Sequence, residues 1–235
     1  MSQPLWKDGP VLHQAPDVFP LGTDSILLAD FARPGKADRI LDLGTGGGTL
    51  PVLMGFGRPD LRFTAVENDP AACPLARKNR AENGIPAEVL EADLRNYREI
   101  LPAGAFDLTV SNPPYFEQSG GLVSNHLGAA RSDRGCTLAE LCAAAAWATR
   151  WGGRFCLVFR PERIPALFAA LEAAGFAVKR LRPVHHSPDK PANLLLIEAR
   201  RGGNPGLRWE EDLFLRTADG LDSPEVLRIY HRTKE

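Results

Sequence analysis

Short apolar runs of strand length recur along the chain, and each is bounded by turn residues. They occupy residues 39–43, 62–67, 87–92, 106–111 and 153–159. The stretches between them carry helical patterns, notably residues 70–83, 137–151 and 161–174, the last closed by Gly175. Because strand and helix alternate, the pattern predicts an α/β fold with a parallel sheet covered by helices on both faces.

The two ends of this alternating region have patterns of their own. Residues 23–31 predict a helix with Thr23 and Asp24 at its N-cap, ended by Arg33-Pro34-Gly35. Residues 177–184 and 192–200 predict two more strands that return as an antiparallel hairpin. We therefore expect a seven-stranded, mostly parallel sheet in one domain over residues 1–235, with an N-terminal loop segment (1–22) and a C-terminal extension (202–235).

A glycine-rich turn follows the first predicted strand, with the sequence Asp42-Leu43-Gly44-Thr45-Gly46-Gly47-Gly48-Thr49. Glycines at such a turn allow the backbone to approach a ligand closely. Glu67 closes the second strand, where a carboxylate can accept hydrogen bonds from ribose hydroxyls, and Asp93 follows the third, where one can accept from an adenine amino group. The turn and Glu67 would serve NAD or S-adenosylmethionine equally well.

The fourth predicted strand ends in Ser111-Asn112-Pro113-Pro114-Tyr115-Phe116. The two prolines extend the backbone and remove two N–H donors. The Asn112 side-chain carbonyl and the Pro113 main-chain carbonyl can then both accept hydrogen bonds from one NH2 group, with Tyr115 stacked on the planar target and Phe116 extending the apolar wall. This arrangement favours methyl transfer to nitrogen by orientation, without a strong general base. It does not choose among adenine N6, cytosine N4, guanine N2 and a glutamine amide.

Charge is unevenly distributed although the net charge is only -1. Residues 1–130 hold 11 Lys and Arg against 16 Asp and Glu (-5), residues 131–201 hold 12 against 6 (+6), and the remainder holds 5 against 7 (-2). A basic middle is compatible with a face that contacts phosphate, and also with an ordinary solvated surface.

The remaining composition predicts no further chemistry. Cys73, Cys136, Cys142 and Cys156 have no C-x-x-C spacing, so we expect free thiols and no metal site. The chain has no apolar run of signal-peptide or membrane-span length, and we expect a cytoplasmic protein.

The order of these motifs resembles the bacterial methyltransferases that modify adenosine 37 of valine tRNA at N6. The resemblance covers most of the chain. It rests on the stretch from Gly22 to Leu28 (GTDSILL), the Asp42–Gly46 turn, Glu67, Asp93, the Ser111–Phe116 motif, and Asn193–Glu198 (NLLLIE). Ala129-Ala130-Arg131-Ser132-Asp133 stands where the family usually has Ala-Arg-His-Glu, so Ser132 departs from the common His.

This resemblance implies a Rossmann-like class I methyltransferase fold, S-adenosylmethionine as donor and a tRNA anticodon loop as acceptor. We expect a monomer without metal. The target adenosine would leave its stack to reach Asn112. The cofactor-binding residues of this chain would be Thr23, Asp42, Gly44, Thr45, Gly46, Gly48, Glu67, Asn68, Asp93, Leu94 and Asn112. Its catalytic residues would be Asn112, Pro113, Pro114 and Tyr115. Its substrate contacts would be Tyr115, Phe116, Arg131, Arg160, Lys179, Arg180, Arg182 and Lys190.

Other functions remain open from the sequence. A protein glutamine methyltransferase shares this chemistry, but it usually carries a helical N-terminal domain, and only about 20 residues precede the Thr23 helix. A ribosomal RNA methyltransferase is also compatible. A noncatalytic RNA-binding module would not need Gly44, Glu67, Asp93 and Asn112 together, and no Tyr-x-x-x-Lys supports an NAD-dependent dehydrogenase.

Overall fold

The computed structural model describes residues 4–36, 38–113 and 136–233. Within them, one sheet has the strand order β3-β2-β1-β4-β5-β7-β6, and two short strands, β8 and β9, pair with β6. The strands are β1 (Arg39–Leu43), β2 (Arg62–Glu67), β3 (Ala87–Glu91), β4 (Phe106–Ser111), β5 (Thr149–Phe159), β6 (Phe176–His185), β7 (Ala192–Arg201), β8 (Arg208–Trp209) and β9 (Leu213–Phe214). Seven strands therefore form the predicted sheet, and the C-terminal extension adds two that the sequence did not indicate.

Strand directions agree with the predicted architecture. β1 through β5 are mutually parallel, and β7 runs antiparallel to both β5 and β6. The carboxyl ends of the parallel strands consequently share one edge of the sheet, where open α/β sheets bind their ligands.

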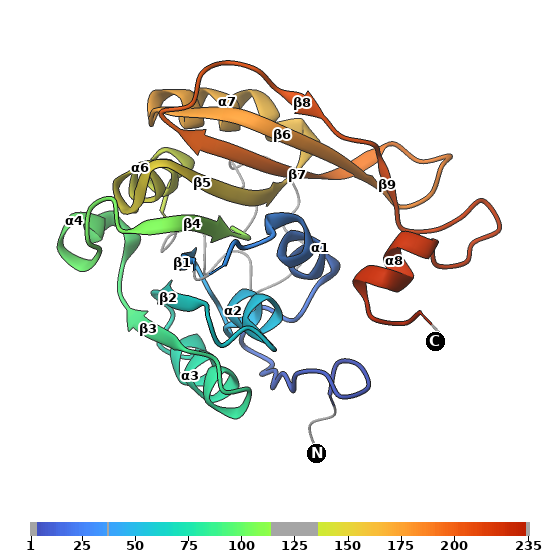
Figure 1. Ribbon diagram of the computed structural model, residues 1–235, viewed down its shortest axis with the longest axis horizontal. Coiled ribbons are helices and arrows are strands. Elements are labelled where there is room, and N and C mark those ends of the chain that lie inside the picture. The colour runs from blue at the N-terminus through green and yellow to red at the C-terminus, as the bar shows by residue number, and fades with distance from the viewer. Residues whose placement is uncertain (1–3, 37, 114–135, 234–235) are drawn as a thin grey trace.

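Helices cover both faces of the sheet (Figure 1). The helices are α1 (Thr23–Ala32), α2 (Thr49–Gly55), α3 (Ala72–Glu82), α4 (Tyr97–Ile100), α6 (Leu138–Ala148), α7 (Ile164–Ala173) and α8 (Pro224–Ile229), with the 3-10 turns η1 (Leu94–Asn96) and η2 (Pro161–Arg163). Helices α1, α2 and α8 contribute to the hydrophobic cluster on one face, and α6 and α7 to the cluster on the other.

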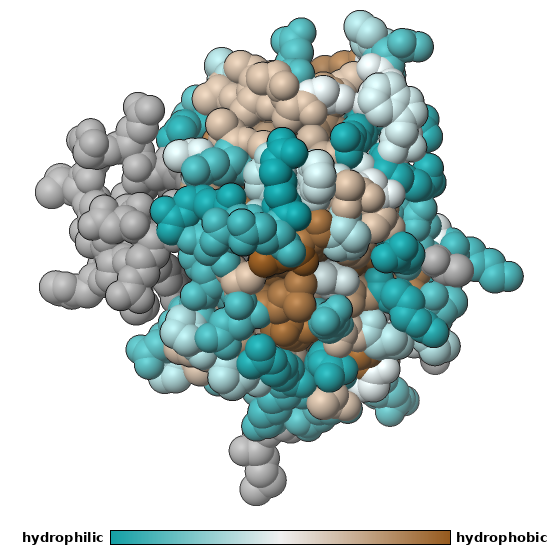
Figure 2. Space-filling model, turned by 90° about the vertical axis from the view of Figure 1, so that its left-hand side faces the viewer, coloured by the Kyte–Doolittle hydropathy of each residue, from teal (hydrophilic) through white to brown (hydrophobic). Residues whose placement is uncertain are grey.

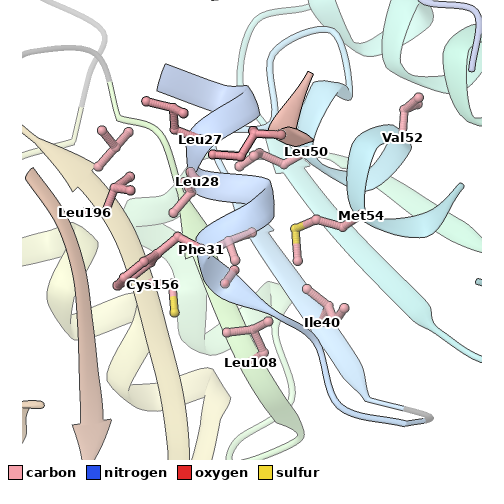
Figure 3. Packing of buried hydrophobic residues seen from close by; sticks show 14 of the residues in the cluster. Leu27, Leu28, Phe31, Ile40, Leu50, Val52, Met54, Leu108, Cys156 and Leu196 are labelled. Atoms are coloured by element: carbon pink, nitrogen blue, oxygen red, sulfur yellow. The ribbon is translucent and has the colours of Figure 1, made fainter. Parts of the chain in front are cut away.

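Helix α1 is wedged between the sheet and α2. Leu27, Leu28 and Phe31 are almost completely buried, and Figure 3 shows Leu28 and Phe31 directed toward Leu196 and Cys156 of the sheet, with Met54 of α2 on the other side of the helix. Full burial of an apolar side chain of this size contributes about 1.5–3 kcal/mol. The start of α1 is therefore held firmly beside the carboxyl end of β4.

The side of the molecule that Figure 1 shows at the left has a mixed surface. Figure 2 views this side directly and shows hydrophilic residues around a central hydrophobic strip, with a paler, moderately hydrophobic patch above it. Leu90, Leu94 and Ile100 are partly buried against the second hydrophobic cluster. The outer strand β3 and α4 thus complete the core rather than leave it open.

Two predicted boundaries need correction. The N-cap of α1 is Gly22, which makes no side-chain capping bond, so Thr23 and Asp24 already lie inside the helix. Residues Thr149–Trp151 belong to β5 and not to the preceding helix. Thr149 pairs with Phe106 of β4, and its hydroxyl lies 2.7 Å from that of Thr109, so cross-strand contacts decide its conformation.

The C-terminal extension docks onto the sheet and α1 through ion pairs. The Arg182 guanidinium binds the Glu225 carboxylate at 2.7–2.8 Å, and Arg228 binds Asp30 of α1 at 3.0 Å. Val226 and Ile229 of α8 are buried in the first hydrophobic cluster. These contacts between the C-terminal extension and the rest of the fold are compatible with the predicted single domain, which stays a prediction.

Candidate active site

The glycine-rich turn that follows β1 contains three glycines in the left-handed backbone conformation. Gly44, Gly46 and Gly48 have φ angles of +75°, +55° and +79°. A Cβ atom at Gly48 would also lie 3.1 Å from the Ala76 Cα of α3, whereas one at Gly44 or Gly46 would meet nothing within 4 Å. Gly48 is therefore required for packing against α3, and the first two glycines leave open space beside the backbone.

Asp42 lies completely buried beneath this turn. The Thr45 hydroxyl donates to Asp42 Oδ2 at 2.5 Å, while Asp42 Oδ1 has no hydrogen-bond partner among the described residues. Burial raises the pKa of Asp42 to about 7; the Thr45 hydrogen bond opposes this shift and the Glu67 carboxylate adds to it. An unpartnered buried carboxyl oxygen under an open backbone turn fits a site that receives a polar ligand.

Glu67 fastens the end of β2 to the glycine-rich turn. Its Oε2 accepts from the Gly46 amide at 2.7 Å, and its Oε1 accepts from the amides of Asn68 and Asp69, each at 2.9 Å. The side chain is partly exposed. The structure therefore brings Asp42, the turn and Glu67 together, as the sequence predicted, and leaves Asn68 at the exposed rim.

Asp93 caps the 3-10 turn that follows β3. It accepts from the Arg95 amide at 2.9 Å and forms an ion pair with the Arg95 guanidinium. The hydrogen bond from Arg95 is the main reason that the pKa of Asp93 is lowered, so Asp93 is an anionic acceptor at neutral pH. Leu94, half-buried, is the first residue of that turn.

Asn112 comes directly after β4, and its amide is hydrogen-bonded to helix α1. Asn112 Nδ2 donates to the hydroxyl oxygen of Ser25 in α1 at 3.0 Å, so the Oδ1 atom is the acceptor that remains. Ser25 is buried and Asn112 is half-buried. One residue earlier, the Ser111 hydroxyl donates to the Leu43 carbonyl at 2.7 Å and ties β4 to β1.

Other predicted residues of this region can be placed only in part. The Thr23 hydroxyl accepts from the Tyr230 hydroxyl at 3.1 Å, which links the start of α1 to the C-terminal extension. Pro113 is buried. Pro114, Tyr115, Phe116 and Arg131 lie outside the described residues.

Asn79 of α3 and Asn83, the C-cap residue of α3, form contacts that sequence reasoning missed. Asn79, fully buried, accepts from the His13 amide at 2.8 Å and donates to the carbonyls of His13 (3.0 Å) and Gly47 (2.8 Å). Asn83 makes the corresponding pair with Val11, at 2.8 and 2.7 Å. Asn79 thus joins the N-terminal segment to the glycine-rich turn. The only sequence signal was two asparagines four residues apart, on one face of a helix.

The predicted phosphate contacts are not gathered at the glycine-rich turn. Arg180 bonds Glu198 and Glu210, and Arg182 bonds Glu225, with 16% and 13% of the side chains exposed. Arg160 donates to the Asn193 carbonyl, Lys179 to the Asn204 carbonyl, and exposed Lys190 lies 3.6 Å from Asp189. Arg180 and Arg182 are therefore engaged by carboxylates of the chain itself.

The described residues contain no cluster of three or more His, Cys, Asp or Glu side chains that could hold a metal ion. The four cysteines are free thiols, with Cys73, Cys142 and Cys156 buried. In the same part of the chain, every helix is too short or too polar to cross a membrane.

Comparison with known proteins gives a consistent family. Residues 17–164 match the family model described as the methyltransferase small domain. A relative from Tolumonas auensis, named tRNA1(Val) (adenine(37)-N6)-methyltransferase, is 32% identical, and the match covers 89% of this chain and 87% of the relative.

Two solved structures share the fold. A predicted O-methyltransferase from Agrobacterium tumefaciens superposes with a TM-score of 0.73 at 24% identity, covering 91% of this chain and 98% of that one. A 16S rRNA N2 G1207 methyltransferase from T. thermophilus, solved with AdoMet and guanosine, superposes with a TM-score of 0.57 at 25% identity, covering 82% of this chain and 47% of that one. These matches agree with the Rossmann-like class I methyltransferase architecture expected from the sequence.

Proposed function

The chain belongs to the methyltransferase small domain family of S-adenosylmethionine-dependent enzymes, and on that premise we propose that it methylates the N6 atom of an adenosine in tRNA. The names of its curated relatives point further, to adenosine 37 of valine tRNA. The observation that carries the proposal is the hydrogen-bonded Asn112 amide at the carboxyl end of β4, with its carbonyl oxygen left as an acceptor.

The cofactor pocket that we propose lies along the ends of β1, β2 and β3. Its support is the open left-handed turn at Gly44 and Gly46, the unpartnered Oδ1 of Asp42, and the carboxylates of Glu67 and Asp93. Glu67 would accept from the ribose hydroxyls and Asp93 from the adenine amino group. When bound, S-adenosylmethionine supplies an electrophilic methyl group on a sulfonium centre.

The role of the chain toward the acceptor is to orient it. Asn112 Oδ1 and the Pro113 carbonyl would accept both hydrogens of the adenosine amino group, which holds the nitrogen lone pair toward the methyl donor. Asn112 Nδ2 already donates to Ser25, which leaves Oδ1 available to accept from the substrate amine. Tyr115 and Phe116 remain sequence-based proposals for stacking on the extruded base.

The test is methyl transfer from labelled S-adenosylmethionine to total tRNA from a strain that lacks the protein, followed by nucleoside mass spectrometry. N6-methyladenosine in the valine tRNA is the expected product. Incorporation only into ribosomal RNA or into glutamine-containing protein would contradict the tRNA assignment.

An Asn112→Ala variant tests the mechanism separately. Because it removes the orienting acceptor, it should lose turnover by about a hundredfold or more, with a much smaller effect on S-adenosylmethionine binding. Unchanged turnover would exclude the role of Asn112.

The oligomeric state that we propose is a monomer.

A further inference from the structure

A cleft of about 370 Å³ lies beside the N-terminal half of β6, and its lining includes no residue of the glycine-rich turn. Five cationic side chains and one carboxylate line it, together with Gly206: Arg154, Lys179, Arg180, Arg200, Arg208 and Glu198. Its walls come from β5, β6, β7 and β8, and Figure 1 shows β8 running along the outside of β6. The lining therefore has a large excess of positive charge.

Internal ion pairs account for only part of this charge. Glu198 binds both Arg154 and Arg180, Glu210 binds both Arg180 and Arg208, and Asp38 lies 3.7 Å from Arg154, so three carboxylates serve three arginines. Lys179 donates to the neutral Asn204 carbonyl, and Arg200 donates through Nε to the neutral Gly152 carbonyl. Lys179 and Arg200 consequently add positive charge that no carboxylate in the cleft compensates.

The exposed cations have the geometry to reach a ligand. Arg200 is exposed and uses only its Nε in the bond to Gly152, and 71% of the Arg208 side chain is exposed. Arginine guanidinium groups bind phosphate oxygens through two parallel hydrogen bonds. Behind them, Arg180 is fixed by two carboxylates and by the Phe31 ring 4.2 Å away, so the cleft has a rigid floor.

Position along the sheet relates the cleft to Asn112. Arg154 pairs with Leu108, four residues before Asn112, and Arg208 lies four strands from β4. Strand geometry places the cleft about 15–20 Å from Asn112. Helix α1 spans the interval on one face, because Ser25 contacts Asn112 and the Ala32 carbonyl accepts from Arg154 at 2.8 Å.

We propose that this cleft binds the phosphate backbone of the substrate RNA to one side of the methylated adenosine. The inference rests on the proposed function, because it takes the acceptor to be RNA. The cleft would fix the position of the RNA, while the contacts at Asn112 select the base.

The test compares two double variants that each remove two exposed positive charges. Arg200→Gln/Arg208→Gln alters the cleft, and Arg77→Gln/Lys78→Gln alters exposed residues of α3 as the matched control. In the cleft variant, the KM for tRNA should rise about tenfold and the slope of log affinity against log salt should fall by about 2. The kcat at saturating tRNA and the KM for S-adenosylmethionine should stay at wild-type values. The control should match the wild type throughout.

Two outcomes separate the failures. If wild-type protein methylates tRNA and the cleft variant keeps its KM and salt slope, the cleft is an ordinary solvated surface and only this inference fails. If wild-type protein leaves tRNA unmethylated, the proposed function fails. The measurement of RNA affinity against salt concentration still tests the cleft in that case. Equal RNA affinity of the cleft variant and the control would overturn the proposed role of the cleft.

Discussion

Asn112 and Ser25 are 87 positions apart in sequence, yet the amide nitrogen of one donates to the hydroxyl oxygen of the other at 3.0 Å. The bond joins the carboxyl end of β4 to the first turn of α1, and Leu27 and Leu28 bury that helix against the sheet. Ser25 thereby acts as a positioning residue, which decides the atom that Asn112 presents to a substrate amine.

Ser25→Ala should lower kcat by about fivefold, since one hydrogen bond that orients the amide contributes about 1 kcal/mol. The KM for S-adenosylmethionine and the thermal midpoint should change little, because the new residue favours a helix. Ser25→Thr keeps the hydroxyl and should recover most of the activity. Equal loss in the Ala and Thr variants would show that the space around Ser25 matters, and not its hydrogen bond.

Asn79 should affect cofactor binding although we assign it no cofactor contact. Its amide holds the Gly47 carbonyl and both backbone groups of His13, so Asn79→Ala should loosen the glycine-rich turn. We expect the dissociation constant for S-adenosylmethionine to rise about tenfold by isothermal titration calorimetry.

Asn83→Ala provides the matched control for this prediction. It removes the corresponding two bonds to Val11 and one to the Asn79 carbonyl, but no bond to the turn. If both variants weaken cofactor binding equally, the effect comes from the N-terminal segment as a whole and not from the bond to Gly47.

Glu67 is predicted to bind the ribose of the cofactor. Glu67→Gln retains the size of the side chain but removes the charge and one acceptor oxygen, so the dissociation constant for S-adenosylmethionine should rise by about tenfold to a hundredfold. Glu88→Gln, an exposed residue of β3, is the control. A dissociation constant in Glu67→Gln that equals that of the control would remove Glu67 from the ribose site.

The sequence was sufficient to predict features that depend on a single strand and the turn after it. The ends of β1, β2 and β4 were located correctly, and so were the glycine-rich turn and Glu67. These features depend on local alternation of apolar residues and on turn chemistry, which neighbours in the sequence determine.

Contacts between distant segments could not be found in this way. The Lys179–Arg182 run suggested an exposed basic surface, but alternate residues of a strand face the same side, so Arg180 and Arg182 both point toward carboxylates. Their partners Glu198, Glu210 and Glu225 come from later segments, and the extension that carries two of them had no readable pattern. Ser25 and Asn79 escaped notice for the same reason.

Asp42 should make the stability of the protein depend on pH. Its pKa is about 7 in the folded protein and 3.8 in an unfolded chain, so the folded state binds the proton more tightly. The stabilising effect of that proton is complete below about pH 4, and it is lost as the pH rises through about 7. Between pH 5 and pH 8, the cofactor-free protein should lose about 3 kcal/mol of unfolding free energy relative to Asp42→Asn, which cannot ionise.

Urea unfolding of both proteins at several pH values measures this difference directly. Other titrating groups are common to the two proteins, so their effects cancel when the curves are subtracted. The sign of the pH dependence distinguishes Asp42 from an ion-paired carboxylate. Glu210, whose pKa is lowered by its hydrogen bond with Arg180, makes the folded protein more stable as the pH rises. Parallel curves for the wild type and Asp42→Asn would mean that Asp42 is ionised in its buried site, and that its free Oδ1 atom carries charge beneath the glycine-rich turn even without a ligand.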